Sequence, residues 1–200
     1  MKELIMKYES IIENLNTVFR AFLREDERAL SDALEEISRR MDQGSTLYIF
    51  GNGGSAAQSQ HFAAEIVNQF RVDRRPLPAL ALSTDTSVLT SISNDRDFSD
   101  IFSRQIRALA RNGDVAVGLT TSGRSDNVIR GLQAAREKGL YTLALTGEGG
   151  GRLRGAVDVL LAVPSPDTAR IQEIHLILLH LMAEDIERRL ASKELKGAAT

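Results

Sequence analysis

Five short apolar runs, separated by polar or helical segments, constrain the fold of this chain more than any other feature of its sequence. They cover residues 46–50, 79–83, 115–119, 141–145 and 157–163, and they are partly β-branched. Buried strands that alternate with helices are typical of a parallel sheet whose crossover helices cover its faces. The sequence therefore predicts an α/β fold built on a parallel sheet.

Small polar loops follow most of these strands. They are Gly51-Asn52-Gly53-Gly54-Ser55, Ser83-Thr84-Asp85, Thr120-Thr121-Ser122-Gly123 and Thr146-Gly147. Ligands of open parallel sheets bind at the carboxyl ends of the strands. We therefore expect these loops to meet along one edge of the sheet.

Helices are expected at both ends of the chain. In residues 1–44, apolar residues recur at spacings of four and three, which predicts two amphipathic helices broken at Glu25-Asp26-Glu27 and suited to core or subunit contacts. The last helix covers residues 168–190, and its stretch 174–182 is apolar on nearly every side, which is typical of a buried helix. We expect a single domain over residues 1–200, with a helical segment 1–44, an α/β core 45–190 and a frayed tail 191–200.

Charge and composition exclude several classes of protein. Lys and Arg number 25 and Asp and Glu number 27, which gives a net charge of −2; bulk electrostatic binding of nucleic acid needs a net basic face instead. The chain contains no cysteine, which excludes disulfides, a cysteine nucleophile and cysteine-based metal sites. It has no apolar stretch of about 18 residues to span a membrane, and its charged start is unlike a signal peptide. We expect a cytoplasmic protein with neither a nucleic-acid nor a membrane partner.

The glycine loop, residues 51–57, follows a strand and opens a helix. Glycines at such a place let the backbone approach a ligand, and a helix N-terminus favours an anion. The alternative is a tight turn that binds nothing.

A second loop, Thr120-Thr121-Ser122-Gly123-Arg124-Ser125, precedes a helix expected over residues 126–138. We name residues 120–125 the hydroxyl loop, because it offers four hydroxyl groups beside one arginine. Hydroxyls, backbone N–H groups and a helix dipole together suit a phosphate monoester. The alternative is that Ser125 or Asp126 merely caps the helix.

Two helices offer histidines beside polar partners. His61 and Glu65 are four residues apart and so share one helix face close to the glycine loop. The last helix carries Gln172, His175 and His180, and His180 must pair its ring nitrogens within an apolar run. A lone buried histidine is more often a core residue than a catalyst, but two helices with this pattern favour a site.

These motifs occur in a fixed order: Gly51–Ala57, Gln60–Glu65, Asn94-Asp95, Thr121-Ser122-Gly123-x-Ser125 and Arg170-Ile171-Gln172-Glu173-x-His175. In combination they resemble the sugar-isomerase (SIS) domain family and, within it, the phosphoheptose isomerases, over roughly residues 3–190. The resemblance implies a five-stranded parallel sheet sandwiched by helices, a doubly wound and flavodoxin-like fold. It also implies a homotetramer, packed through its N-terminal helices, with active sites between subunits.

The resemblance further implies an aldose–ketose isomerase that converts sedoheptulose 7-phosphate to D-glycero-D-manno-heptose 7-phosphate. This is the first step toward the heptoses of bacterial lipopolysaccharide and other surface glycans. The reaction transfers a proton through an enediol and needs no nucleotide cofactor. By the same resemblance Glu65 and His180 are the acid–base pair, and a zinc ion seen in some members is bound by His61, Glu65, Gln172 and His180. The implied substrate-binding residues are Asn52, Gly53, Gly54, Ser55, Glu65, Asn94, Asp95, Thr120, Thr121, Ser122, Ser125 and Gln172.

Several alternatives stay open. Glu65 is expected to act as base, as ligand or as both, because a carboxylate bound tightly to zinc is a weaker base. Thr120 and Arg124 replace the serine and asparagine common in the family loop, which leaves the contacts to the sugar open. A related non-catalytic SIS protein binds a replication initiator but lacks the counterparts of Glu65 and His180, so this chain resembles the enzymes more. An isomerase of another sugar phosphate is the third alternative.

Overall fold

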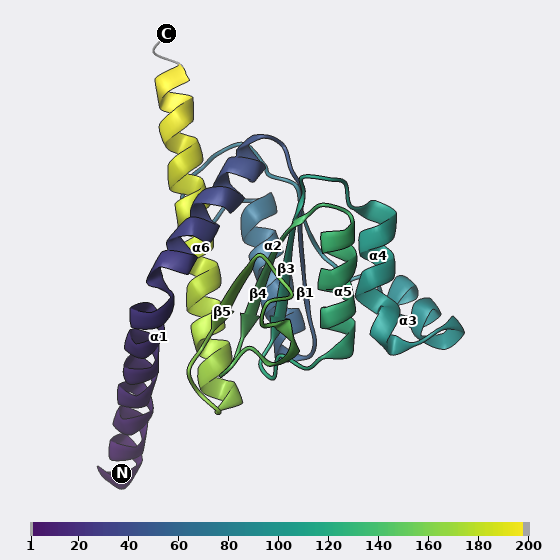
Figure 1. The fold of residues 1–200 in the computed structure, drawn as a ribbon. Helices are drawn as coiled ribbons and strands as arrows, with labels where there is room; N and C mark the ends of the chain where they lie inside the picture. The colour runs from purple at the N-terminus through teal and green to yellow at the C-terminus, as the bar shows by residue number, and fades with distance from the viewer. Residues whose placement is uncertain (1, 198–200) are drawn as a thin grey trace.

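The computed structural model describes the backbone of residues 2–197 and the side chains of residues 5–191. One sheet holds five parallel strands, β1 (Leu47–Gly51), β2 (Ala79–Ala81), β3 (Val115–Thr120), β4 (Tyr141–Thr146) and β5 (Val159–Ala162). Their order is β2-β1-β3-β4-β5 (Figure 1). This is the flavodoxin-like order, and it confirms the expected five-stranded parallel sheet, with strand ends that differ from the predicted ones by no more than two residues.

Successive strand residues point to opposite faces of the sheet, and helices cover both faces. Leu47 and Ile49 belong to a core formed with α1 (Lys2–Asp42), α2 (Gly54–Val67) and α6 (Thr168–Gly197). Tyr48 and Phe50 belong to the opposite core, formed with α3 (Thr86–Asp95), α4 (Ile101–Leu109) and α5 (Asp126–Glu137). Short 3-10 turns lie at Phe98–Asp100 and Gly151–Leu153. The sheet is therefore sandwiched by helices, as expected.

The prediction of two N-terminal helices is wrong, because α1 is one continuous helix from Lys2 to Asp42. Residues 2–42 contain neither glycine nor proline, so the acidic triplet has nothing that breaks a helix. Asp26 is also used structurally: its Oδ2 accepts a hydrogen bond of 3.3 Å from the Ala162 amide of the edge strand β5. Figure 1 shows the N-terminal part of α1 extending beyond the body of the molecule.

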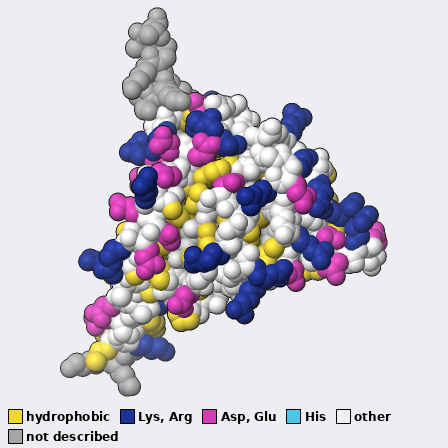
Figure 2. All heavy atoms as spheres, in the orientation of Figure 1, with side chains coloured by type: hydrophobic (Ala, Val, Ile, Leu, Met, Phe, Trp, Pro, Cys, Tyr) yellow, Lys and Arg dark blue, Asp and Glu magenta, His cyan; other side chains and the backbone are white. Residues whose placement is uncertain are grey.

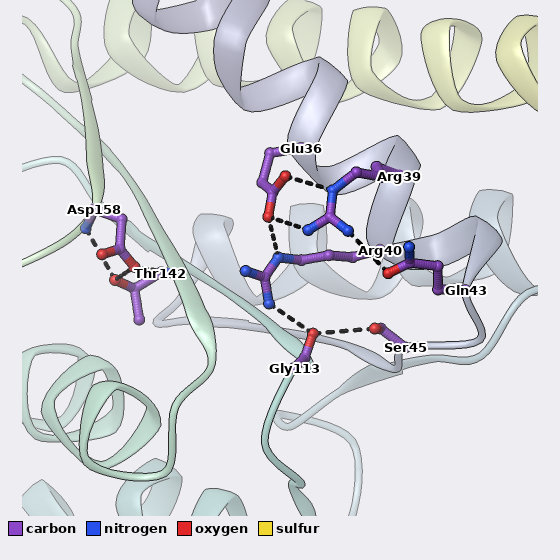
Figure 3. Close-up of polar contacts among 8 residues, drawn as sticks. All are labelled: Glu36, Arg39, Arg40, Gln43, Ser45, Gly113, Thr142 and Asp158. Carbon is purple, nitrogen blue, oxygen red and sulfur yellow. Dashed lines mark hydrogen bonds and ion pairs between the residues drawn. The ribbon is translucent and has the colours of Figure 1, made fainter.

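The end of α1 is fixed to the edge of the sheet opposite the polar loops. Arg39 and Arg40 both donate to the Glu36 carboxylate, at 2.7 and 2.6 Å (Figure 3). Arg40 also donates to the Gly113 carbonyl oxygen at 2.9 Å, and so does Ser45 at 3.0 Å. The hydrogen bonds that Glu36 accepts, first from Arg39 and then from Arg40, lower the pKa of its carboxyl to about 2. The end of α1 is thus bound to the loop that precedes β3.

The last helix is longer than expected. It begins at Thr168, as predicted, but ends at Gly197 rather than at residue 190. Helical backbone therefore replaces most of the expected frayed tail, and residues 198–200 lie outside the described residues. Ile174, Leu178 and Met182 are fully buried, in agreement with a helix that is apolar on nearly every side.

The surface carries charges of both signs. On the face drawn in Figure 2, Lys and Arg side chains are interspersed with Asp and Glu side chains, in line with the net charge of −2. In the part of the chain that the structure describes, no helix combines the length and the hydropathy needed to cross a membrane.

Candidate active site

The glycine loop makes a tight turn from β1 into α2. A Cβ atom on Gly51 would lie 2.7 Å from the Ser55 Cβ and 2.9 Å from the Leu119 carbonyl oxygen. Gly53 has a φ of 55°, in the left-handed region that favours glycine. Asn52 exchanges two hydrogen bonds of 2.8 Å with Asn127 at the start of α5. The turn is thus tight and is bound to the loop that follows β3.

The hydroxyl loop folds back on itself at the carboxyl end of β3. Thr120 Oγ1 lies 3.0 Å from Ser125 Oγ and 3.5 Å from Ser122 Oγ. Ser122 Oγ accepts from the Arg124 amide at 3.2 Å. Ser125 occupies the N-cap position of α5, yet among the described residues its side chain makes no capping hydrogen bond. Helix capping by Ser125 therefore does not account for its hydroxyl, which turns toward the loop.

A cavity of about 310 Å³ opens beside the hydroxyl loop. Thr121, Ser122 and Arg124 line it from the loop, and two more hydroxyl groups come from Ser165, just before α6, and from Thr168, the first residue of α6. The cavity thus joins hydroxyls, an arginine and the N-terminal ends of two helices, a combination that suits a phosphate group. The hydroxyl loop identified from the sequence supplies three of the eight residues that line this cavity; Glu148, Ser165 and Thr168, which also line it, were not predicted.

His61, Glu65 and His180 meet between α2 and α6. His61 Nε2 lies 3.1 Å from Glu65 Oε1, and His180 Nε2 lies 3.6 Å from the same oxygen. The two histidine Nε2 atoms are 3.0 Å apart. The side chain of Glu65 is 12% exposed, against 50% for His61 and 37% for His180. The structure thus brings together the proton-transfer pair and three of the four metal ligands that the resemblance implies.

The surroundings of Glu65 suit a proton acceptor. Burial raises the pKa of the Glu65 carboxyl above its ordinary value, and the nearby His61 and His180 act in the opposite direction. Its Oε2 atom is buried and has no hydrogen-bond partner among the described residues. A carboxylate with a raised pKa is a stronger base than an exposed one. The free Oε2 atom is also available for a ligand.

The donor set of this cluster fits a divalent metal ion. Two imidazole nitrogens and one carboxylate oxygen lie within 4.8 Å of one another, and nitrogen and oxygen donors of this kind bind zinc. The unpartnered Oε2 of Glu65 is a buried acceptor that such an ion would satisfy. The cluster is therefore compatible with a metal site.

Gln172 lies elsewhere on α6. A Cβ atom on Gly54 would lie 2.7 Å from Gln172 Nε2, so the amide covers the glycine loop. Eight residues separate Gln172 from His180, which is about 12 Å along a helix. Within one chain, Gln172 is therefore not a fourth ligand beside the other three. Its expected role in substrate binding at the glycine loop stays a prediction.

Asn94 and Asp95 also lie apart from the other candidate residues. Both are exposed at the end of α3, where Asn94 Nδ2 donates to Asp95 Oδ1 at 2.9 Å. In Figure 1, α3 lies beyond α4 and α5, on the side away from α6. A single chain does not bring this pair to the glycine loop or to the histidines.

One neighbour of the cluster was not predicted from the sequence. The Phe70 ring stacks on the His180 ring, with centroids 5.3 Å apart and planes at 17°. Phe70 lies in a largely polar segment after α2, where Val72 is its only apolar neighbour, so no periodic pattern marks it.

Comparison with known proteins agrees with this geometry. Residues 11–147 match the family model described as the SIS domain. The phosphoheptose isomerase of Geobacter sulfurreducens is 50% identical over 173 residues, covering 86% of this chain and 92% of that protein. That of Aquifex aeolicus is 44% identical over 190 residues, covering 92% of this chain and 100% of that protein.

Solved structures extend the likeness to three dimensions. The phosphoheptose isomerase of Neisseria gonorrhoeae superposes with a TM-score of 0.85 at 40% identity, covering 92% of this chain and 99% of that one. That of Francisella tularensis gives a TM-score of 0.87 at 32% identity, with coverage of 92% and 98%. This chain therefore belongs to the SIS domain family and, within it, to the phosphoheptose isomerases.

Proposed function

We propose that this protein is an aldose–ketose isomerase that interconverts sedoheptulose 7-phosphate and D-glycero-D-manno-heptose 7-phosphate, the first step of heptose biosynthesis. The observation that carries the proposal is the contact of Glu65 with His180, 3.6 Å between Oε1 and Nε2. A non-catalytic SIS protein has no need of a half-buried carboxylate beside an accessible imidazole. Membership of the phosphoheptose isomerases supports the same conclusion.

The substrate would be anchored by its phosphate. The hydroxyl loop and the start of α6 supply hydroxyl groups, N–H groups and positive helix ends to the 310 Å³ cavity, which together favour a dianion. In the proposed site, the glycine loop and Gln172 contact the sugar chain. This division leaves the reacting carbons to the histidine–carboxylate cluster.

Isomerisation then needs two kinds of proton transfer. From the ketose, a base removes a proton from C1 while the C2 carbonyl oxygen gains one, which gives an enediol; the O1 proton then leaves and C2 gains a proton, which gives the aldose. Glu65, whose pKa is raised by burial, is suited to move the carbon-bound proton. His180, 37% exposed and in contact with Glu65, is suited to move the protons between O1 and O2. No proton is gained or lost overall.

We also propose zinc at the cluster, held by His61, Glu65 and His180. When bound, the ion would act as a Lewis acid that polarises the substrate carbonyl. Elemental analysis of the purified protein should find one divalent ion per chain, and a strong chelator should lower activity. A metal-free protein whose activity resists the chelator would contradict this assignment.

A homotetramer with shared sites is the proposed assembly. Ile5, Met6, Tyr8 and Ile12 on α1 are each more than half exposed, an apolar surface that a second subunit would cover. Ile171 of the phosphate cavity is nine residues from His180, about 14 Å along α6, whereas the eight bonds of about 1.5 Å from C1 to the phosphorus atom span at most roughly 12 Å. The cavity of one subunit and the cluster of another would therefore form one site.

Hybrid oligomers test this sharing. A variant with Ser122→Ala and Ser125→Ala, mixed and reassembled with Glu65→Gln, should regain activity at low substrate concentration, because some sites then combine two intact parts. Light scattering should give about four times the chain mass. An active monomer, or hybrids no better than the separate variants, would contradict shared sites.

The central experiment is incubation with sedoheptulose 7-phosphate, followed by NMR for the aldose product. Formation of the aldose supports the assignment. Faster turnover of a pentose or hexosamine phosphate would favour an isomerase of another sugar phosphate, and no turnover of any of them would favour a binding protein.

We further propose that residues 1–200 form a single domain. We also propose a cytoplasmic location, because a phosphate dianion does not cross an apolar bilayer unaided.

A further inference from the structure

The segment between α2 and β2 folds around a buried ion pair. Arg74 Nε lies 3.4 Å from Glu187 Oε1, and the two side chains are 0% and 2% exposed. Arg74 belongs to this segment, whereas Glu187 lies on α6, seven residues after His180 and so on the same helix face. Removing one member of such a pair leaves a buried charge without its partner. The pair therefore joins the segment firmly to α6.

Glu187 also binds the backbone of the segment. Its carboxylate accepts hydrogen bonds from the amides of Phe70, Arg71 and Val72, at 2.6, 2.9 and 3.1 Å. Three backbone donors on one buried carboxylate fix the course of these three residues. The position of Phe70 is thus determined from α6.

Arg74 binds the end of α2 in a corresponding way. Its Nη2 donates to the Glu65 carbonyl oxygen at 2.8 Å, and its Nη1 donates to the Asn68 carbonyl oxygen at 3.3 Å. Carbonyl groups in the last turn of a helix have no partner within the helix. Arg74 supplies a donor to two such carbonyl groups, and one of them belongs to Glu65 itself.

Phe70 connects this bound segment to His180. Its ring stacks on the imidazole at 5.3 Å between centroids, and the Arg71 guanidinium lies over the Phe70 ring at 4.9 Å. Arg71 is in turn paired with Glu184 on α6 at 3.0 Å. The imidazole of His180 is therefore flanked by a ring whose backbone is bound to the same helix.

We propose that Glu187, Arg74 and Phe70 are positioning residues for the proton-transfer pair: Arg74 fixes the backbone of Glu65, and Glu187 holds the Phe70 ring against His180. The kinetic part of this inference rests on the proposed isomerase function. A side chain that is 37% exposed has room to change rotamer, and displacement of a catalytic group by about 1 Å can cost as much as a hundredfold in rate. One buried ion pair would thus align both groups.

Substitution at Phe70 tests the contact with His180. Phe70→Leu keeps an apolar side chain but removes the ring, and kcat should fall about tenfold with KM nearly unchanged. Phe70→Tyr keeps the ring and should restore kcat. The matched control is Tyr141→Leu, which removes another half-buried ring lying under an arginine, Arg40 at 5.2 Å, at the start of β4. It should leave kcat unchanged.

Histidine NMR provides a readout that does not depend on activity. The chain has three histidines, so selective labelling gives few signals, and His180→Gln identifies that of His180. The stacked Phe70 ring should shift the NMR signal of the His180 ring proton upfield. Phe70→Leu should remove this upfield shift and Phe70→Tyr should keep it, whereas the His175 signal should not move in either variant. If the wild type lacks isomerase activity but shows this behaviour, the proposed function fails and the positioning of His180 stands.

Substitution at Glu187 tests the ion pair. A folded Glu187→Gln variant should move the His180 signal and lower kcat, and adding Phe70→Leu to it should cost less than Phe70→Leu costs alone, because both act on His180. If Glu187→Gln fails to fold, the Phe70 variants still decide. An unmoved His180 signal in Phe70→Leu, or kcat losses that multiply independently in the double variant, would overturn the inference.

Discussion

Replacing the buried His175 by glutamine should remove much of the acid sensitivity of the fold. His175 is fully buried, and its Nε2 donates to the Thr146 carbonyl oxygen at 3.1 Å, at the end of β4. Burial lowers the pKa of His175 from 6.5 to about 4. Between these two values the folded chain keeps this imidazole neutral, whereas the unfolded chain binds a proton.

The size of the effect follows from the two pKa values. Because the unfolded state binds the additional proton, the free energy of unfolding should fall as the pH drops from 6.5 toward 4, and this group should have no effect above that window. Linkage gives a loss of about 2 kcal/mol between pH 7.5 and pH 5. Glutamine keeps an N–H donor for the Thr146 carbonyl but does not titrate, so the variant should lack this loss.

Urea unfolding, followed by circular dichroism at pH 7.5 and pH 5, measures this loss in the free energy of unfolding. Wild type and His175→Gln are compared at the same chain concentration, since association contributes to apparent stability. Carboxyl groups titrate in both proteins, so the difference between their pH dependences isolates His175. If both proteins lose the same stability between the two pH values, His175 is not held neutral by burial and the reasoning fails.

Three further predictions address the site and the anchor of α1. Ser122→Ala with Ser125→Ala should raise KM and weaken inhibition by inorganic phosphate with little change in Tm; a wild-type KM would contradict phosphate binding at the hydroxyl loop. Glu65→Gln should lower kcat by about 10²–10⁴-fold, and adding His180→Gln should lower kcat little further, since paired groups act as a unit. Near-normal turnover of Glu65→Gln without added zinc would contradict the assignment of Glu65 and His180 as the proton-transfer pair. Glu36→Gln should lower the free energy of unfolding by about 1 kcal/mol at pH 7, because the lowered pKa of Glu36 stabilises the fold above pH 4.5. The difference from wild type should shrink as the pH falls toward 2, and equal urea midpoints of the two proteins at pH 7 would contradict this prediction.

The fold was predictable where burial acts on a whole segment. The inner strands β1, β3 and β4 are buried on both faces, so apolar runs of five residues were enough to locate them. The predicted break in α1 failed for a local reason. Asp26 looked like a solvated charge between two helices, but it pairs with the exposed edge of β5, and only the three-dimensional structure places that edge beside it.

The site was predictable only in part. The spacing of His61 and Glu65 placed them together, because four residues return to the same helix face. The spacing could not place His180 beside them, since its contact depends on how α2 and α6 lie on the sheet. The buried partners Arg74 and Glu187 gave no signal, because charged residues are usually exposed and these two are far apart in the sequence.

The two histidines of α6 owe their different properties to their angular positions on one helix. Five residues separate His175 from His180, so at about 100° per residue their side chains point roughly 140° apart. His175 faces the sheet, where it binds the end of β4 and burial keeps it neutral. His180 faces α2, where it contacts Glu65 and His61 and stays 37% exposed. The apolar surface of α6 that buries one histidine therefore leaves the other accessible beside Glu65, where we propose that proton transfer takes place.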